Sequence, residues 1–372
     1  MRLIVVAPRL VQTGGMDRPN LALVARALER GLEVTAVTHD VEPGTLRSKG
    51  LELWRVPKPF SSIVLGEAVL EHYGNRARRR YPEAVVLANG GNLVGADLNW
   101  VHYVHAAEPM LADGGAAHLY RRVRHARYLR RERRAVVSAR WLIADSNRCR
   151  EDLLARYPLD PMRVRSVYYG TDPASGSKHE TREVCERVAG LNRGVQRAMF
   201  VGGIGDRRKG LDTLLKAWAL LRRKGDWAVE LLVAGEGPAR TAFEREARDL
   251  GLSRSVHFLG FRTDVPTLLG AVDCVVSPTR YEPYGLAVHE ALCARVPAIV
   301  SAKAGIAERY PPSLRPLLLS DPEDPDELAA KLIEWRNDAA HYARAAVEFA
   351  PQLASRSWSD MADEILDLAS PR

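Results

Sequence analysis

The feature that most constrains the fold of this chain is a regular alternation of short apolar runs with helical patterns. Leu3–Ala7 is apolar throughout, Asn20–Arg30 carries its apolar residues on a helical repeat, and Val34–Thr38 is the next apolar run. Runs that are apolar at successive positions are typical of strands covered on both faces in a parallel sheet. The alternation predicts an α/β protein, and the length of 372 residues predicts two doubly wound domains.

The same alternation locates the other expected elements. In the first half, strands are expected at Leu51–Val56, Ala84–Ala88, Trp100–His105, Trp141–Asp145 and Arg165–Tyr169, and helices at Leu119–Val137 and Arg150–Tyr157. In the second half, strands are expected at Ala198–Val201, Val229–Ala234, Val256–Leu259, Cys274–Ser277, Ala298–Ser301 and Pro316–Leu319. The helices expected there are Leu211–Arg223, Ala239–Leu250, Val265–Ala271, Gly285–Arg295 and Asp326–Asn337. Ligands of such sheets bind beyond the carboxyl ends of strands, so the loops that follow strands should carry the function.

A break in this rhythm marks the domain boundary. The run Pro173–Lys178 is rich in Pro, Ser and Gly, and polar residues with two further glycines follow it. Such residues interrupt regular structure and are typical of connections. We therefore expect a first domain over residues 1–172, a linker over 173–197 and a second domain over 198–351.

Charge is distributed unevenly along the chain. The net charge is +8, and residues 1–190 hold 30 Lys and Arg against 21 Asp and Glu, so the basic surplus belongs to the first half. One expected helix is especially basic and contains Arg121, Arg122, Arg124, Arg127, Arg130, Arg131, Arg133 and Arg134. This helix is either a solvated face of an arginine-rich chain or a patch that meets an anionic membrane surface or a phosphorylated acceptor.

Other features exclude several classes of protein. The chain has no apolar run of the ~18 residues needed to span a bilayer, and Met1–Pro8 lacks the features of a secretory signal. The cysteines are far apart and form no Cys-x-x-Cys pair, which argues against a disulfide framework or a zinc site. They are Cys149, Cys185, Cys274 and Cys293. The expected location is the cytoplasm.

The most informative segment is Ser277–Ala291, which follows an expected strand and opens a helix. Glu282 lies in the loop, Glu290 lies further along in the helix, and the amides of Gly285 and Leu286 come between them. Unpaired amides at a helix N-terminus attract anions, and carboxylates accept hydrogen bonds from sugar hydroxyls. The spacing therefore suits a ligand with both a diphosphate and sugars. The alternative is a surface loop whose acidic residues only favour the helix dipole.

This segment resembles the Glu-x7-Glu motif of family 4 glycosyltransferases of the GT-B fold. Further matches follow the family's order and are Phe200–Gly203, Arg208–Ala217, Val233–Pro238, Phe258–Phe261 and Ala304–Glu308. The resemblance covers residues 3–370 and implies two Rossmann-like domains that face each other across a cleft. It also implies that the tail, residues 352–372, returns to the first domain.

The resemblance implies roles for residues of the second domain. Glu290 would bind the ribose hydroxyls of the donor, and Glu282 would meet the transferred sugar. Lys209 with Arg208 would neutralise the leaving diphosphate. The amides of Gly285 and Leu286 would meet the diphosphate, and Tyr284 would line the donor site. Arg262, which follows Phe261, is a candidate to lie near the nucleobase. Arg262 is equally well interpreted as an exposed arginine.

One position departs from the family pattern. Family members often carry an arginine where this chain has Gly203, which puts the second cationic contact with the diphosphate in doubt. Arg208 or Arg207 is the expected replacement.

In the first domain, the loop Gln12–Arg18 contains Gly14 and Gly15 after a strand, a pattern that often serves only a tight turn. The resemblance implies that the backbone of this Gly-Gly loop, at Gly15, approaches the donor phosphate and the acceptor. It also implies that His105, at the end of an expected strand, lies near the anomeric carbon. His102 is three residues earlier, so strand alternation places it on the opposite face, packed against a helix.

The resemblance predicts a retaining glycosyltransferase that moves a sugar from a UDP- or GDP-sugar to a hydroxyl of a sugar, lipid or metabolite. It implies no cofactor besides the nucleotide sugar and no essential metal, and we expect a same-face displacement. The alternatives are a nucleotide-sugar epimerase of the same fold and a non-catalytic nucleotide-sugar-binding protein. Nucleic acid is not an expected partner. The basic helix leaves peripheral contact with the inner face of a membrane as an alternative.

Overall fold

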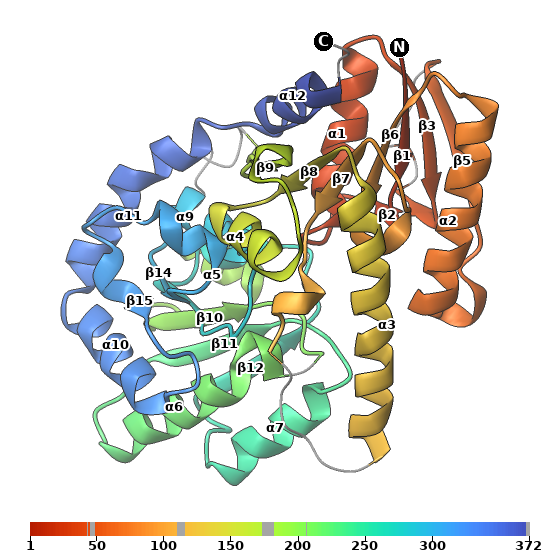
Figure 1. Cartoon of the computed structure of the whole chain (residues 1–372). Coiled ribbons are helices and arrows are strands. Elements are labelled where there is room, and N and C mark those ends of the chain that lie inside the picture. The colour runs from red at the N-terminus through yellow and green to blue at the C-terminus, as the bar shows by residue number, and fades with distance from the viewer. Residues whose placement is uncertain (43, 45–48, 110–115, 173–181, 206, 370–372) are drawn as a thin grey trace. The chain divides into compact units, whose positions relative to one another are not determined.

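The computed structural model describes residues 1–42, 44, 49–109, 116–172, 182–205 and 207–369, with the side chains of residues 116–121 left aside. The chain divides into two compact units (Figure 1). Unit 1 comprises residues 1–170 and 356–372, and unit 2 comprises residues 171–355. Part of the segment expected as a linker, residues 182–197, is thus built into unit 2, whereas Pro173–Lys178 lies outside the described residues.

Unit 1 is built on a parallel sheet of seven strands in the order β5-β3-β1-β6-β7-β8-β9. The strand order reverses between β1 and β6, which pair with each other. The central β1 is almost fully buried because helices cover both faces of the sheet. The strands are β1 (Arg2–Val6), β3 (Glu33–Thr38), β5 (Leu51–Arg55), β6 (Val85–Asn89), β7 (Leu98–Val101), β8 (Trp141–Ala144) and β9 (Val164–Ser166), and a separate pair is formed by β2 (Arg9–Leu10) and β4 (Asp40–Val41).

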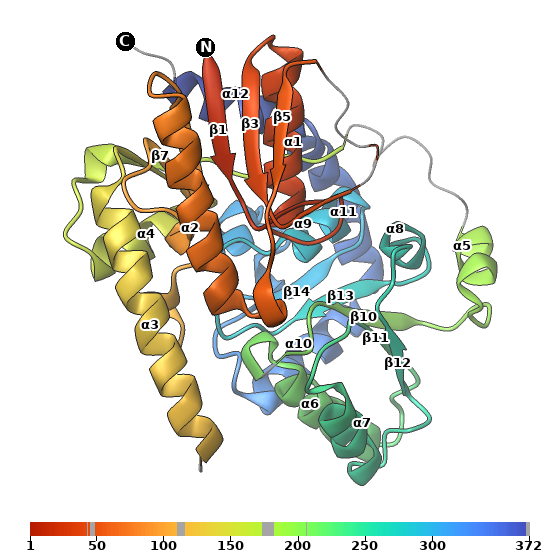
Figure 2. The ribbon, with the colours of Figure 1, turned by 90° about the vertical axis from the view of Figure 1, so that its right-hand side faces the viewer.

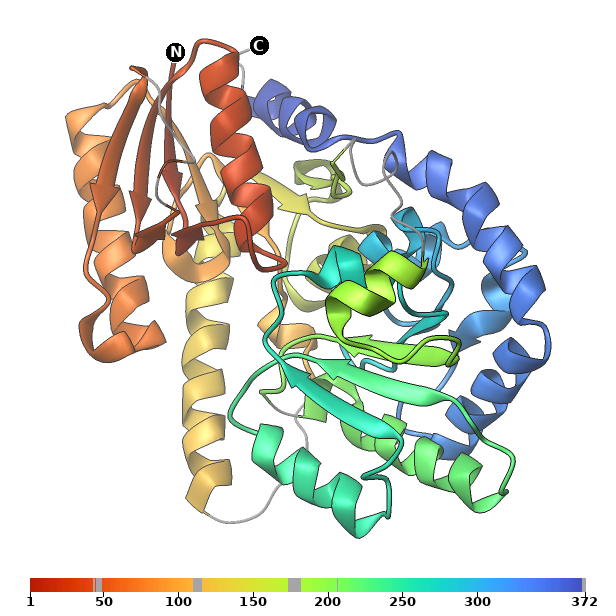
Figure 3. The same ribbon diagram turned by 180° about the vertical axis from the view of Figure 1, so that it is seen from behind.

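Helices pack on both faces of this sheet. In Figures 2 and 3, α1 and α12 lie on one face and α2 lies on the other, with α3 beside it. The helices are α1 (Asp17–Glu29), α2 (Ile63–Arg80), α3 (Ala116–Ser138), α4 (Asn147–Arg156) and α12 (Trp358–Ala369). Helix α2 is absent from the elements expected from the sequence.

The chain leaves unit 1 and returns to it at adjacent points. A Cβ on Gly170 would lie 2.1 Å from the carbonyl oxygen of Ser357, so the two backbone segments are in contact. The Arg356 guanidinium donates to the carbonyl oxygen of Tyr168 at 2.9 Å. From there α12 packs along α1, where Arg26 forms two hydrogen bonds with the carboxylate of Asp363.

Unit 2 has a second parallel sheet, of six strands in the order β12-β11-β10-β13-β14-β15. Its order reverses between β10 and β13. The strands are β10 (Arg197–Val201), β11 (Glu230–Ala234), β12 (Val256–Gly260), β13 (Cys274–Ser277), β14 (Ala298–Ser301) and β15 (Leu318–Leu319). The helices are α5 (Arg182–Ala189), α6 (Leu211–Arg223), α7 (Arg240–Asp249), α8 (Val265–Leu269), α9 (Leu286–Cys293), α10 (Pro325–Asn337) and α11 (Ala339–Ala354).

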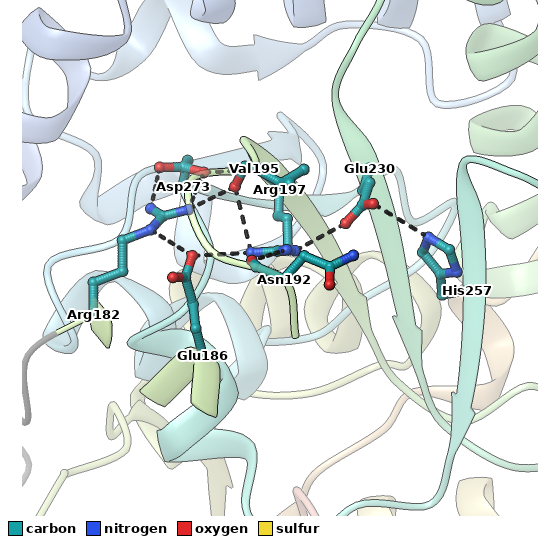
Figure 4. Close-up of polar contacts among 8 residues, drawn as sticks. All are labelled: Arg182, Glu186, Asn192, Val195, Arg197, Glu230, His257 and Asp273. Atoms are coloured by element: carbon teal, nitrogen blue, oxygen red, sulfur yellow. Dashed lines mark hydrogen bonds and ion pairs between the residues drawn. The ribbon is translucent and has the colours of Figure 1, made fainter. Parts of the chain in front are cut away.

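A buried ionic cluster fastens α5 to the amino ends of the unit 2 strands (Figure 4). The Arg197 side chain is fully buried and donates to Glu186 and Glu230, each at 3.0 Å. Arg182 bonds with both carboxylate oxygens of Asp273 and with Glu186. Because removing one partner of a buried pair leaves an uncompensated charge, this cluster makes α5 an integral part of unit 2.

Helix α11 ends at Ala354, and α12 starts only at Trp358. The unit boundary therefore lies inside the tail that the sequence assigned as one piece, residues 352–372. Within the described part of the chain, no helix is both long and apolar enough to cross a membrane. The four cysteines are buried, and none of them forms a disulfide.

Candidate functional site

The candidate site of unit 2 lies where its strand order reverses. Lys209 lies in the loop after β10, and Glu282 lies in the loop after β13. Because β10 and β13 are neighbours in the sheet, their carboxyl ends place these two loops together. Ligands of open α/β sheets bind at such a reversal point.

The structure brings three of the predicted residues into contact. The Lys209 ammonium and the Glu282 carboxylate form an ion pair, with side chains only 20% and 15% exposed. The Arg208 guanidinium lies 3.9 Å from the same carboxylate and donates to the carbonyl oxygen of Tyr281 at 2.9 Å. Two cations and one anion therefore converge at the carboxyl edge of the sheet.

The two loops are also joined through their backbones. Gly210, directly after Lys209, has a φ of +72°, and a Cβ there would lie 1.8 Å from the carbonyl oxygen of Pro278. Arg280 reaches across and makes a bidentate pair with Asp212 in the first turn of α6, at 2.8 and 2.9 Å. We did not predict this role for Arg280, although it lies inside the motif that carries Glu282.

The amino end of α9 faces the same edge. Gly285 precedes the helix with a φ of +109°, and a Cβ there would lie 2.9 Å from Ile306. The N–H groups of Gly305 and Ile306 donate to the carbonyl oxygens of Glu282 and Tyr284. The loop after β14 thus supports the turn that presents the first amides of α9, beginning at Leu286. The first amides of a helix have no intrahelical acceptor and suit an anion.

Tyr284 and Glu290 occupy different environments. The Tyr284 ring is buried, and its hydroxyl hydrogen-bonds with Nδ1 of His289 at 2.7 Å, so the side chain packs inside the unit. Glu290 is partly buried on α9. The pKa of the Cys293 thiol is raised to about 11, mainly by burial and to a smaller extent by the negative charge of Glu290.

Two further positions bear on the donor site. The Nε and Nη2 groups of Arg262 donate to the two carboxylate oxygens of Asp264, at 2.7 and 2.6 Å. A Cβ on Gly203 would meet nothing within 4 Å, so space does not explain why the family's arginine is missing there. Of the two expected replacements, Arg208 lies near Glu282, whereas Arg207 pairs with Asp212 at 3.6 Å.

In unit 1, the glycine loop follows β1 at that sheet's reversal point. The conformational need for glycine falls on Gly14, whose φ is +105°, whereas a Cβ on Gly15 would meet nothing within 4 Å. Asp17 follows in the first turn of α1, and burial raises the pKa of its carboxyl to about 6 despite Arg9 at 3.4 Å. The raised pKa keeps the Asp17 carboxyl protonated over a wider pH range than that of an ordinary aspartate.

The strand expected at Trp100–His105 is wrong in its second half. β7 ends at Val101, where its pairing with β8 ends, and His105 instead opens a short 3-10 helix, His105–Ala107. Strand alternation therefore does not decide the faces of His102 and His105. The His105 side chain is 33% exposed and lies just beyond the carboxyl end of the sheet.

His102 belongs to a buried polar chain. It hydrogen-bonds with Asn89 at 3.1 Å and with the hydroxyl of Tyr169 at 2.6 Å. Burial lowers its pKa to about 3, so its ring is neutral at physiological pH. These contacts assign His102 to packing.

The basic helix expected at Leu119–Val137 is α3. Its arginine side chains are mostly exposed, but Arg131 is turned inward and pairs with Glu67 and Glu71 of α2 at 3.3 and 3.2 Å. The side chain of Arg121 lies outside the described residues. The exposed arginines are Arg122, Arg124, Arg127, Arg130, Arg133 and Arg134.

The described residues contain no group of three or more His, Cys, Asp or Glu side chains that could hold a metal ion. One Asp-x-Asp string, Asp324–Asp326, is present in the sequence. Asp324 caps α10 by accepting from the N–H groups of Asp326 and Glu327, so this string serves the helix. A cavity of about 190 Å³ in unit 1, lined by Glu83, Asp97 and neighbouring residues, lies at the opposite, amino edge of its sheet.

Two family models match the chain. The model described as Glycosyltransferase Family 4 matches residues 13–175, and the model described as Glycosyl transferases group 1 matches residues 195–338. The first therefore falls almost entirely in unit 1, and the second falls in unit 2 with the Lys209–Glu282 pair. The chain belongs to glycosyltransferase family 4. The resemblance inferred from the motifs is thereby confirmed.

Individual family 4 relatives support this assignment. The chain is 25% identical over 349 residues to the lipopolysaccharide glucosyltransferase WaaG of Escherichia coli, covering 89% of this chain and 91% of WaaG. It is 30% identical over 253 residues to a D-inositol 3-phosphate glycosyltransferase of Salinispora tropica, covering 64% of this chain and 52% of that relative. The chain thus spans about half the length of the inositol phosphate glycosyltransferases that it matches.

Solved structures show that this family 4 member has the GT-B fold. The crystal structure of WaaG superposes with a TM-score of 0.80 at 21% identity over the whole of both chains. Sucrose-phosphate synthase of Thermosynechococcus elongatus gives 0.80 at 18% identity, covering 99% of this chain and 98% of that one. HepE of Anabaena, solved with UDP-glucose, gives 0.72 at 18% identity over 99% of this chain and 98% of that one.

Proposed function

We propose that this family 4 protein transfers a sugar from a nucleoside-diphosphate sugar to an acceptor hydroxyl, with retention of configuration. The observation that carries the proposal is the ion pair of Lys209 and Glu282 at the strand-order reversal of unit 2, beside the amino end of α9. Cations and helix amides together suit a diphosphate, and a carboxylate suits sugar hydroxyls.

Breaking the bond between sugar and diphosphate leaves negative charge on the diphosphate. In the proposal, Lys209, Arg208 and the first amides of α9 stabilise that charge. A single well-aimed donor of this kind contributes about 2.7–4 kcal/mol to a reaction barrier. When the donor binds, its phosphate oxygens would replace Glu282 as the partner of Lys209. The Glu282 carboxylate would then be available to the transferred sugar.

The remaining assignments are parts of the same proposal. His105 serves the reacting sugar, the backbone of the Gly14–Gly15 loop approaches the donor phosphate and the acceptor, and Glu290 binds the ribose. The displacement takes place on one face of the sugar, with no cofactor besides a UDP- or GDP-sugar and no essential metal. Because relatives are named for lipopolysaccharide and for D-inositol 3-phosphate, the proposed acceptor is a hydroxyl of a sugar, lipid or metabolite.

The test begins with donor binding. Titration calorimetry with UDP, GDP and their sugars identifies the donor, and the Glu290→Ala variant is then compared with the wild type. Because hydrogen bonds to a charged group contribute about 1.5–3 kcal/mol, the dissociation constant should rise roughly 10- to 150-fold. The matched control is Glu246→Ala, which removes a partly buried helix glutamate of α7 in the same unit.

Three outcomes would contradict the proposal. Unchanged donor affinity in Glu290→Ala would refute the ribose assignment. Conversion of the donor alone, without an acceptor, would favour the epimerase. Donor binding without any transfer or hydrolysis above the buffer background would favour a non-catalytic binding protein.

We further propose that the exposed arginines of α3 contact an anionic membrane surface. Each basic side chain near such a surface contributes about 1 kcal/mol, and the contact is screened by salt. The protein should sediment with phosphatidylglycerol vesicles but not with phosphatidylcholine vesicles, and Arg122→Glu combined with Arg130→Glu should release it. Equal sedimentation of the variant would exclude this surface and leave a phosphorylated acceptor as the anionic partner.

A further inference from the structure

Helix α3 contains one acidic residue, and that residue is turned inward. Glu132 lies among the arginines of the segment 121–134, yet its side chain is buried with a residue exposure of 2%. A buried carboxylate is costly unless hydrogen bonds satisfy it. Its partners therefore indicate what the residue is for.

Three donors meet the Glu132 carboxylate. Oε1 accepts from the N–H of His105 at 2.8 Å, and Oε2 accepts from the N–H of Ala106 at 3.1 Å. The Tyr157 hydroxyl also donates to Oε2. The two N–H groups open the 3-10 helix His105–Ala107, where no residue of the same turn can accept from them. Glu132 thus caps this turn from a different helix.

The same face of α3 also holds the imidazole ring. Tyr128 lies one helical turn before Glu132, and its ring stacks on that of His105 with centroids 4.9 Å apart and planes at 21°. Tyr103 meets the ring edge-on, with centroids also 4.9 Å apart. Glu108 Oε2 lies 3.9 Å from Nδ1 of His105. Helix α3 therefore holds His105 at its backbone through Glu132 and at its ring through Tyr128.

We propose that Glu132 is a positioning residue for His105, and that Tyr157 holds the carboxylate in place. This inference rests on the proposed function, in which His105 serves the reacting sugar. Small displacements of a reacting group cost large factors in rate, which gives this contact a role beyond packing. Burial and the neighbouring Glu132 raise the pKa of Tyr157, so its hydroxyl stays protonated and donates.

The main test is the Glu132→Gln variant, because glutamine has nearly the same shape. Its NH2 group donates and cannot accept, so at least one of the three donors would lose its partner. We expect kcat to fall about 10- to 100-fold while the KM for the donor sugar changes less than about twofold. In a His105→Ala background, Glu132→Gln should cause no further loss of kcat.

A second readout needs neither substrate nor activity. The NMR signals of the His105 ring, assigned by their loss in His105→Ala, should shift or broaden in Glu132→Gln. Tyr157→Phe leaves the carboxylate in place and removes one donor, so it should cause a smaller change in the same signals. If Glu132→Gln does not fold, the same measurements on Tyr157→Phe decide the question.

The chain offers a matched control. Glu52 on β5 accepts from the Tyr81 hydroxyl at 2.6 Å, from Trp54 Nε1 at 3.0 Å and from Arg2 at 3.0 Å. It belongs to the same unit but lies on the edge strand rather than beside His105. Glu52→Gln and Tyr81→Phe should therefore lower the melting temperature and leave both kcat and the His105 signals unchanged.

The outcomes separate this inference from the proposed function. Unchanged His105 signals, or an equal loss of kcat with and without His105, would overturn the positioning role. If no donor and acceptor pair supports transfer, the proposed function fails, and shifted His105 signals in Glu132→Gln would still show that Glu132 sets the placement of this side chain.

Discussion

The contact between Gly210 and Pro278 gives the sharpest prediction for stability. An alanine at position 210 would have to adopt a φ of +72°, which costs roughly 1–2 kcal/mol for a residue with a Cβ. Its Cβ would lie 1.8 Å from the carbonyl oxygen of Pro278 and 2.8 Å from the carbonyl carbon. These atoms belong to the backbone and cannot rotate away, so overpacking adds roughly 1–3 kcal/mol. The Gly210→Ala variant should lose about 2–5 kcal/mol.

Differential scanning calorimetry measures this loss. For a unit of 150–250 residues, each kcal/mol corresponds to about 2–4 °C, so the unit 2 transition should fall by about 4–20 °C. The matched control is Gly203→Ala, because a Cβ there meets nothing within 4 Å and no positive φ is required. A melting temperature of Gly210→Ala within about 2 °C of the wild type would refute the reasoning. If the variant folds, its affinity for the donor nucleotide should fall as well, because Lys209 precedes position 210.

Two further predictions concern pH. The pKa of Asp17 is raised to about 6 in the folded protein against an ordinary value of 3.8, so stability falls as the pH rises from about 4 to 6. Urea unfolding of Asp17→Asn should lack this loss and gain about 2–3 kcal/mol relative to the wild type at pH 8, and an identical pH slope in both proteins would contradict it. Arg26 lowers the pKa of Asp363, so that pair stabilises the protein above pH ~4 and is lost as the pH falls through the lowered value. Asp363→Asn should melt about 1–3 °C lower at pH 7, and this difference should shrink steadily as the pH falls below about 4, which thermal scans across that range would check.

The central strands were predictable because they are buried on both faces. Cys274–Ser277 and Ala298–Ser301 have the bounds that their apolar runs indicate. Helix α2 was missed because it contains two glycines, which interrupt a helical pattern in a sequence. In the structure both permit close packing, since a Cβ on Gly66 would lie 2.8 Å from His39 and one on Gly74 would lie 3.0 Å from Val6.

The end of β7 could not be predicted from local sequence. The residues after Val101 are apolar or aromatic enough to continue a strand, but the neighbouring strand β8 ends opposite Val101. The turn that follows is capped by Glu132, 27 residues further along the chain. A contact over that distance leaves no local pattern.

The candidate site was predictable in its residue types but not in its contacts. Separate motifs indicated Lys209 and Glu282, and only the order of β10 and β13 explains why they pair. Tyr284 shares the same motif, but its ring turns inward to His289. The sequence alone does not distinguish these two orientations.

The adjacency of Gly170 and Ser357 has a consequence for how the chain can be rearranged. Because the exit and the return touch, residues 171–355 constitute an insertion within an otherwise continuous α/β module. If a short turn replaced residues 171–355, it would connect the segment that follows β9 directly to α12 without stretching either of them. The excised part would start and finish close together, which is the arrangement that tolerates circular permutation and transplantation into another host.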